Sequence, residues 1–518
     1  MPPIDRRFLL NASLSGLVAG FFAPSASRAA EAPLPHLGPT RPFSFAWLRD
    51  HARNLSAYAA PVAPAADLVQ QIDFDATQKI RFRRECALWR KSTAPFPIRF
   101  FHLNKFVPDP VRIHAVSGRS AREILYTPRC FDYDGTRLAQ KLPPDLGFSG
   151  FRVMDGQANE TDWLAFQGAS YFRTAGADNQ YGASARGVAV NTAASTAEEF
   201  PRFSEFWIAE SPGAPVTVYA LLEGPSMTGA YKFAAVRTGG VVIDVHAELF
   251  LRAEVTRLGI APLTSMYWYG ENERPRAVDW RPEIHDSDGL AIWTGKGERI
   301  WRPLIEPPVI QTNSFVDENP KGFGLMQRDR DFDHYQDDGA FYNRRPGIWV
   351  EPRGNWGGGA VQLVEIPTDD EVHDNIVAYW KPSAPVGAGD TPVFDYRLYW
   401  QDQEPHSPQG IAQVVATRIG RGGIPGAPPP KGQWKFVVDF AGGALAGMAA
   451  RYDVSPIVTL SRGKVENHYV IKVVGTSIWR ALFDVSFTGL EPLDLRCYLR
   501  LGDKTLTETW LYQFFPST

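Results

Sequence analysis

The feature that most limits the fold of this chain is the recurrence of short β-rich runs between turn residues. Runs such as VTVYALLEG, VVIDVHAELFLR, AVQLVEI and DYRLYW are separated by Gly, Pro, Asn and Asp clusters. The 518 residues include 45 Gly and 42 Pro, and 13% of them are aromatic. Aromatic and β-branched runs bounded by turn residues are typical of strands. The sequence therefore predicts an all-β fold.

The length of the chain and a change in composition after residue 400 predict two folded domains. Single cores rarely grow beyond about 250–300 residues. QDQEPHSPQG and RIGRGGIPGAPPPKGQ offer little apolar surface to bury, and DLRCYLRL then alternates apolar and polar side chains. One buried and one solvated face is typical of an antiparallel sandwich strand. We expect a large antiparallel β-sandwich over 33–400, a linker and loop over 401–431, and an Ig-like sandwich over 432–518.

Local patterns predict two helices and one hairpin within the large domain. FSFAWLRDHARNLSAYA (43–59) places an apolar stripe at helical spacing, and ADLVQQI (66–72) is a candidate short helix. YKFAAV and VVIDVHAELFLR are joined by the Gly-containing segment 237–240, which predicts a β-hairpin.

The first 29 residues have the pattern of an export signal. Adjacent Arg6 and Arg7 precede a moderately apolar run, and small residues follow near Ala29. A basic start, a short apolar run and a small-residue site indicate a secretory leader of twin-arginine type. The run is broken by polar residues and is too short to span a bilayer. We therefore expect a periplasmic protein.

Charge and cysteine content narrow the function. The net charge is −3 without a basic block, which argues against a nucleic-acid partner, since such binding needs clustered Lys and Arg. Three widely spaced cysteines form neither a disulfide framework nor a metal-ligand pattern. Pairing of Cys86 with Cys130 stays open. No HExxH, paired CxxC, GxSxG or P-loop motif occurs, so we expect no metal and no cofactor.

Carboxylates among aromatic residues are the remaining chemical signal. They occur in IHDSDGLAIW, in RDRDFDHYQDDGAFYNRRPGIWVEPRGNW and in IPTDDEVHDNIVAYWKP (366–382). Glycosidic bond cleavage uses one protonated carboxyl group and one ionised carboxylate, and aromatic rings supply stacking area. For any single acid, a solvated loop position is the commoner alternative.

Long motifs resemble one family. LGFSGFRV, QYGASARG, EEFPRFSEFW, LGIAPLTSM, IHDSDGLAIW, NPKGFGLMQRDRDFDHYQD, YNRRPGIWVEPRGNWGGG, DNIVAYW and ETWLYQFFP resemble the periplasmic glucans biosynthesis family OpgG/OpgD (MdoG/MdoD) over essentially the whole mature chain. The twin-arginine leader is closer to the OpgD type. The resemblance implies a galactose-mutarotase-like β-sandwich followed by an Ig-like domain.

The resemblance also implies anomer-inverting endo-β-1,2-glucanase or transglycosylase chemistry on osmoregulated periplasmic glucans. It makes Asp374 the general acid and Asp286 the base, with Glu371 and Tyr342 lining the same centre. By position and chemistry, the candidate sugar contacts are Arg345, Trp349, Trp356 and His334.

The two acids need opposite electrostatic settings. Asp374 must stay protonated, which burial or the negative charge of Glu371 would favour, and Asp286 should stay ionised in a wetter setting. An inverting pair usually sits about 6.5–9.5 Å apart, and a longer gap requires a proton relay. The loop within 418–434 is short and rich in Gly and Pro, which leaves the choice between hydrolysis and transfer open.

The expected partner is β-1,2-glucan, as a polysaccharide or oligosaccharide. The membrane glucan synthase and a second copy of the chain, as a homodimer, stay open as further partners. The alternative function is a non-catalytic glucan-binding or scaffold protein that assists glucan export or branching.

Overall fold

The computed structural model describes residues 35–59, 68–90, 96–134, 141–156, 159–209, 215–424 and 426–516. The expected export signal, 1–29, lies outside these residues. Within them, no helix has the length and apolar character needed to cross a membrane.

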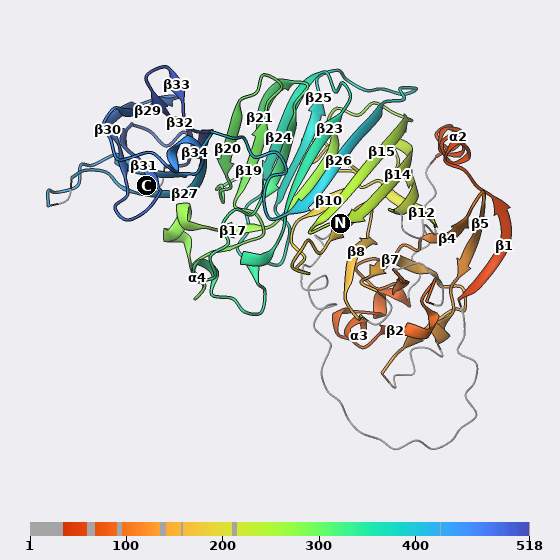
Figure 1. The fold of residues 1–518 in the computed structure, drawn as a ribbon. Coiled ribbons are helices and arrows are strands. Elements are labelled where there is room, and N and C mark those ends of the chain that lie inside the picture. The colour runs from red at the N-terminus through yellow and green to blue at the C-terminus, as the bar shows by residue number, and fades with distance from the viewer. Residues whose placement is uncertain are drawn as a thin grey trace, which may run out of the picture. The chain divides into compact units, whose positions relative to one another are not determined.

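The chain divides into two compact units. The first runs to Pro262 and includes Tyr379–Trp400; the second comprises Leu263–Ala378 and Gln401–Thr518. Strands dominate both units (Figure 1), which confirms the all-β fold class. The sequence-based domain bounds, 33–400 and 432–518, stay a prediction.

The first unit contains two multi-stranded sheets with a few short helices. One sheet has the order β1-β5-β4-β12-β13-β14-β15-β26, and the other contains β10-β9-β8-β7-β3, with β11 paired to β16. The elements are β1 (His36–Pro42), α2 (Phe45–Leu55), η2 (Val69–Gln71), α3 (Phe74–Gln78), β2 (Arg81–Phe82), η3 (Arg84–Cys86), β3 (Ile98–His102), β4 (Arg112–Ser117), β5 (Ser120–Leu125), η4 (Pro128–Cys130), β6 (Phe131–Asp132), β7 (Phe148–Met154), β8 (Asp162–Gln167), β9 (Tyr171–Thr174), β10 (Ser184–Arg186), β11 (Val188–Val190), β12 (Arg202–Ala209), β13 (Val216–Glu223), β14 (Met227–Arg237), β15 (Val241–Leu251), β16 (Leu258–Ser265) and β26 (Val393–Gln401).

Aromatic side chains fill the space between these two sheets. Phe166 on β8 packs edge-on against Phe233 on β14, with ring centroids 5.2 Å apart. Phe151 on β7 meets Phe206 on β12 in the same way, also at 5.2 Å. All four rings are buried. The first unit is therefore a β-sandwich in which period-2 alternation sends aromatic residues inward.

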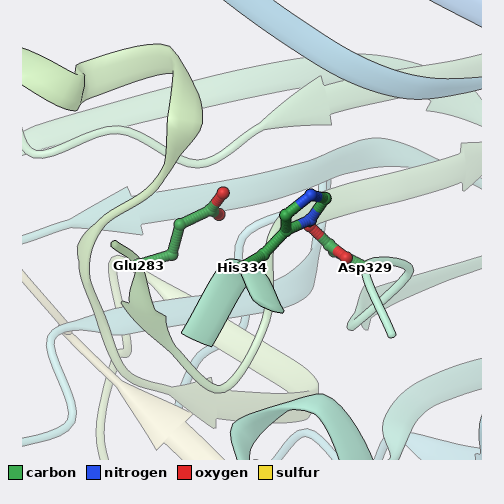
Figure 2. A group of neighbouring side chains, drawn as sticks. All are labelled: Glu283, Asp329 and His334. Atoms are coloured by element: carbon green, nitrogen blue, oxygen red, sulfur yellow. The ribbon is translucent and has the colours of Figure 1, made fainter. Parts of the chain in front are cut away.

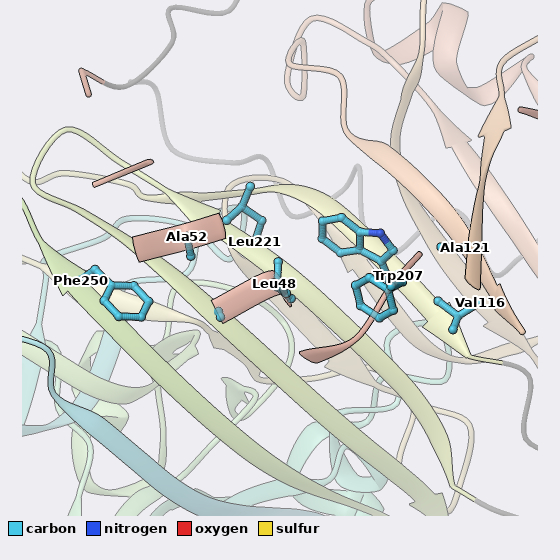
Figure 3. Packing of buried hydrophobic residues seen from close by; sticks show 9 residues of the cluster. Leu48, Ala52, Val116, Ala121, Trp207, Leu221 and Phe250 are labelled. Carbon is cyan, nitrogen blue, oxygen red and sulfur yellow. The ribbon is translucent and has the colours of Figure 1, made fainter. Parts of the chain in front are cut away.

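The expected helix and hairpin both form. Helix α2 begins after Ser44, whose side chain accepts a hydrogen bond from the Trp47 amide, as an N-cap does. Its buried residues Leu48 and Ala52 pack on the sheet near Trp207, Leu221 and Phe250 (Figure 3). Strands β14 and β15 pair in antiparallel register across the turn at 238–240. The second short helix appears as η2.

Cys86 and Cys130 form a disulfide, with Cα atoms 5.5 Å apart. Cys497 is a buried free thiol. The pairing that the sequence left open is therefore made, within the first unit.

The second unit carries the candidate site residues and the C-terminal strands. Its elements are β17 (Tyr267–Tyr269), η6 (Glu271–Arg276), β18 (Ile284–His285), β19 (Gly289–Trp293), β20 (Arg299–Pro303), β21 (Gln311–Glu318), β22 (Gly322–Met326), α4 (Phe332–Tyr335), η7 (Tyr342–Arg344), β23 (Gly347–Arg353), β24 (Gly358–Glu365), β25 (Ile376–Pro382), β27 (Gln413–Arg421), β28 (Gln433–Ala441), η8 (Gly443–Leu445), β29 (Val454–Leu460), β30 (Lys464–Lys472), β31 (Trp479–Ser486), β32 (Leu493–Leu501), β33 (Lys504–Thr505) and β34 (Thr509–Phe514).

The C-terminal strands form a small sandwich inside the second unit. The sheet β27-β28-β31-β30 faces strands β34, β32 and β29, and Phe436 and Phe483 from the first sheet contact Trp510 on β34. Strand β32 alternates buried and solvated residues, as expected. Strand β27 occupies 413–421, within the segment expected to be linker. Its backbone pairs with β28. This strand was missed from the sequence because its apolar residues are sparse and turn-rich segments flank it.

Arg328 ties the C-terminal strands to the rest of the second unit. Its guanidinium pairs with Glu508 at 2.6 Å and also with Glu404, and lies 3.7 Å from the ring centroid of Trp301. Both carboxylates are nearly inaccessible, with 4% of each side chain exposed. The cation therefore compensates two buried negative charges.

Candidate active site

One short segment, 265–267, organises the candidate site. The Asp286 amide donates to the Met266 carbonyl at 2.8 Å, and the Ser265 and Ser287 hydroxyls lie 2.8 Å apart. The Asn375 amide donates to the Ser265 carbonyl at 3.1 Å. Two segments 88 residues apart in the sequence are therefore fixed to the same template, one carrying Asp286 and the other Asp374.

Asn375 fixes the backbone directly after Asp374. Its Oδ1 accepts from the Tyr267 amide at 2.9 Å, and its Nδ2 donates to the Tyr267 and Ile366 carbonyls at 2.8 and 2.9 Å. The Ile366 amide donates to the Asn375 carbonyl at 2.9 Å, which closes the acidic segment into a loop. Asn375 is buried and Asp374 half-buried. The backbone directly after Asp374 is therefore held in place by both the main chain and the side chain of Asn375.

Asp286 is fully buried and forms an ion pair with Arg345. Both side chains are 0% exposed. Arg345 also donates through Nη2 to the Ala340 carbonyl at 3.0 Å. The expectation of a wetter setting for Asp286 was wrong, because a guanidinium and protein atoms surround the carboxylate where water was expected. Its ionised form is favoured by the neighbouring cation rather than by solvent.

Tyr342, Glu371 and Arg281 continue this network. The Arg345 guanidinium lies 4.1 Å from the Tyr342 ring centroid, and the Tyr342 hydroxyl donates to Glu371. Arg281 Nη1 contacts the same Glu371 carboxylate at 2.9 Å and Asp337 at 2.8 Å. Because Arg281 balances the charge of Glu371, that charge is less available to hold a proton on Asp374. The network thus runs continuously from Asp286 to Glu371, three residues before Asp374.

The predicted sugar contacts are mostly buried. Arg345 and Trp349 are 0% and 1% exposed, and Trp356 is 7% exposed. A side chain at Gly322 would collide with the Trp349 ring, which packs directly over that glycine. In this structure these three residues present little surface to a ligand. Their role in sugar binding stays a prediction.

His334, the fourth predicted contact, is accessible, with 44% of its side chain exposed. It lies between Asp329 and Glu283 (Figure 2), and its Nδ1 is 2.6 Å from the Asp329 carboxylate. Burial opposes its charge, but the hydrogen bond to Asp329 and the negative charges of Asp329, Glu283 and Asp331 together raise the pKa of His334. Ligand atoms of Glu283, Asp329 and His334 lie within 4.8 Å of one another. Among the described residues, this is the group that could hold a metal ion.

A row of buried polar residues forms a chain of contacts that begins at Glu283. His285 Nε2 lies 3.0 Å from Glu283, and its Nδ1 lies 3.0 Å from Gln327. Burial opposes the positive charge of His285, yet the contact with Glu283 raises its pKa. Gln327 Nε2 donates to the Tyr335 hydroxyl at 3.1 Å and to the Tyr342 carbonyl at 3.2 Å. This row therefore connects the Glu283 group to the backbone of Tyr342.

Two further acids lie close to Asn375. Glu306 accepts from the Thr368 amide at 2.6 Å, and its second oxygen lies 3.5 Å from Asn375 Nδ2. Glu273 accepts from the Glu306 amide at 2.7 Å. Burial raises the pKa of Glu306 to about 8 and that of Glu273 to about 7. At neutral pH, Glu306 is therefore mostly a neutral acid.

Sequence reasoning missed Arg281, Asn375 and Glu306. Arg281 stands five residues before Asp286, and Asn375 directly follows Asp374. A polar residue beside a candidate catalytic acid is a usable signal for a positioning role. Glu306 carries no such signal, because only the tertiary fold brings it to this place.

These features define an all-β protein whose carboxylate centre lies within the second unit. The model of the periplasmic glucan biosynthesis protein family, MdoG, matches residues 43–514. Glucans biosynthesis protein D 2 of Ralstonia nicotianae is 47% identical, covering 99% of this chain and 98% of that protein. Glucans biosynthesis protein D of Xanthomonas oryzae pv. oryzae is 46% identical, with coverage of 99% and 98%. That of Stenotrophomonas maltophilia is 45% identical, with coverage of 99% and 97%.

The chain belongs to the periplasmic glucan biosynthesis family, and its similarity is to proteins of the D type. The resemblance drawn from the sequence motifs is confirmed.

Proposed function

We propose that this protein cleaves or rearranges β-1,2-glucan in the periplasm, as an anomer-inverting endo-β-1,2-glucanase or a related transglycosylase. The observation that carries the proposal is the continuous network from Asp286 through Arg345 and Tyr342 to Glu371, with Asp374 fixed on the same template. Family membership in glucan biosynthesis supports the substrate class.

In this mechanism Asp374 donates its proton to the glycosidic oxygen as the C1–O bond breaks. A water oxygen, or a sugar hydroxyl in transfer, attacks C1 from the opposite face and gives up a proton to Asp286. Because Asp286 is fully buried, that proton reaches it through a relay of water or substrate hydroxyls. Arg345 keeps Asp286 ionised until the proton arrives.

The test is product analysis after incubation with linear β-1,2-glucan. We expect shorter oligosaccharides from hydrolysis, or cyclic and re-linked products from transfer. Asp374→Asn and Asp286→Asn should each lower the rate by at least about a hundredfold, as loss of a general acid or base does. Asp338→Asn, at an exposed position of the loop before Tyr342, is the matched control. Unchanged glucan with the wild-type protein would refute catalysis.

The second candidate is a non-catalytic glucan-binding or scaffold protein, with the membrane glucan synthase as a partner. The burial of Asp286 favours it, because an inaccessible carboxylate suits a structural ion pair as well as a base. Glucan binding without turnover, equal in wild type and Asp374→Asn, would support this candidate.

A further inference from the structure

A pocket of about 340 Å³ lies beside the loop that carries Asp374. It lies wholly within the second unit and draws its walls from the β17–η6 segment, from the acid Glu306 and from the start of the acidic loop. Its lining residues are Trp268, Arg276, Val278, Glu306, Thr368 and Asp369.

The pocket offers one aromatic face and several hydrogen-bonding groups. Trp268 is half-buried and is braced by Tyr269, with ring centroids 5.2 Å apart. Thr368 contributes a hydroxyl group, and Glu306 and Asp369 contribute carboxyl groups. An apolar face with a few polar groups is the usual composition of a small-molecule site.

The charges of the lining do not favour an anionic ligand. Arg276 is the one cation in the lining, and it faces Glu273 at 3.7 Å. Asp369 is exposed and adds negative charge. A phosphate or carboxylate ligand would find the charge of Arg276 already offset by these acids, whereas a neutral ring with many hydroxyl groups would find donors, acceptors and a stacking face.

Glu306, in the pocket wall, also belongs to the hydrogen-bond network around Asn375, the residue that follows Asp374. Glu306 is 6% exposed; one oxygen accepts from the Thr368 amide at 2.6 Å and the other lies 3.5 Å from Asn375 Nδ2. Asn375 in turn fixes the backbone after Asp374. A ligand that orders Thr368 and Glu306 would therefore order the loop that presents the acid.

We propose that this pocket is a subsite for one pyranose ring of the glucan and that its occupancy aligns Asp374. The inference rests on the proposed function and specifies where a sugar unit remote from the scissile bond is held. Part of the free energy of binding at this pocket would serve to orient Asp374. Glucan too short to fill the pocket should therefore lose kcat as well as affinity.

The test measures binding apart from turnover. Titration calorimetry with linear β-1,2-gluco-oligosaccharides is performed on Asp374→Asn and on the same protein with Trp268→Ala added. We expect Trp268→Ala to weaken binding roughly tenfold, which corresponds to about 1.4 kcal/mol. Trp280→Ala is the matched control, because Trp280 is 69% exposed and lies two residues after Val278 but does not line the pocket.

A second variant guards against a folding defect. If Trp268→Ala lowers thermal stability, Asp369→Ala changes the lining at an exposed position and should weaken binding severalfold. Equal affinity in the parent and in both lining variants would overturn the subsite while leaving the proposed function standing. No glucan binding by Asp374→Asn, together with no turnover by the wild type, would overturn both.

Discussion

Replacing Asn375 by alanine removes one long hydrogen bond to Glu306, at 3.5 Å, and three side-chain hydrogen bonds that fix the backbone directly after the candidate acid. They join Oδ1 to the Tyr267 amide at 2.9 Å, and Nδ2 to the Tyr267 and Ile366 carbonyls at 2.8 and 2.9 Å. Each such bond contributes about 1 kcal/mol net, and each buried group left without a partner costs about 1–3 kcal/mol. We therefore expect the free energy of unfolding to fall by about 3–5 kcal/mol.

The assay is urea unfolding followed by tryptophan fluorescence, paired with glucan turnover in buffer without urea. Asn355→Ala is the control: Asn355 is exposed and accepts one bond, from the Gly357 amide at 2.8 Å. Such a surface change should stay within about 0.5 kcal/mol. Turnover by folded Asn375→Ala should fall through kcat, since Asp374 loses its alignment. A loss of stability below about 1 kcal/mol with wild-type kcat would refute the reasoning.

Three further predictions concern stability. Burial is the chief cause that raises the pKa of Glu306 from 4.5 to about 8 in the folded protein. The unfolded chain therefore loses this proton at a lower pH than the folded protein does, and the free energy of unfolding falls as the pH rises from about 5 to 8. Glu306→Gln should flatten that slope in urea midpoints, and an unchanged slope would contradict the assignment. Replacing both Cys86 and Cys130 by serine removes a disulfide that links residues 44 apart in the sequence. The free energy of unfolding should fall by up to about 4 kcal/mol, seen as a lower thermal midpoint; an unchanged midpoint would argue against the bridge. Arg328→Met leaves the buried Glu508 without its cation and Glu404 with Arg299 alone, 3.5 Å away, and should lower the free energy of unfolding measured in urea by about 3–5 kcal/mol. The loss should be larger at pH 8 than at pH 5, and equal losses at the two pH values would contradict it.

The parts of the fold that sequence could predict are those set by local periodicity. The stripe from Phe45 to Leu55 and the turn at 238–240 each determine a local element, and both formed. Strand β27 was missed because its pairing with β28, not its own composition, makes it a strand.

The candidate site divides in the same way. The motifs named Asp286, Arg345, Tyr342 and Glu371, and the structure links them in one network. Burial could not be read from the motifs, because a tryptophan in a core and a tryptophan at a sugar-binding face look alike in sequence. Trp349 is buried because Gly322 leaves room for its ring, a relationship between two strands that no local pattern encodes.

Proton NMR of the anomeric region during digestion of linear β-1,2-glucan tests the central claim most directly. The account predicts that the wild-type protein first produces α-configured reducing ends if it hydrolyses, or new glycosidic signals without new reducing ends if it transfers. Asp374→Asn should produce neither, while it still binds the glucan. An unchanged spectrum with the wild type, or equal turnover by Asp374→Asn, would contradict the assignment of Asp374 as the general acid.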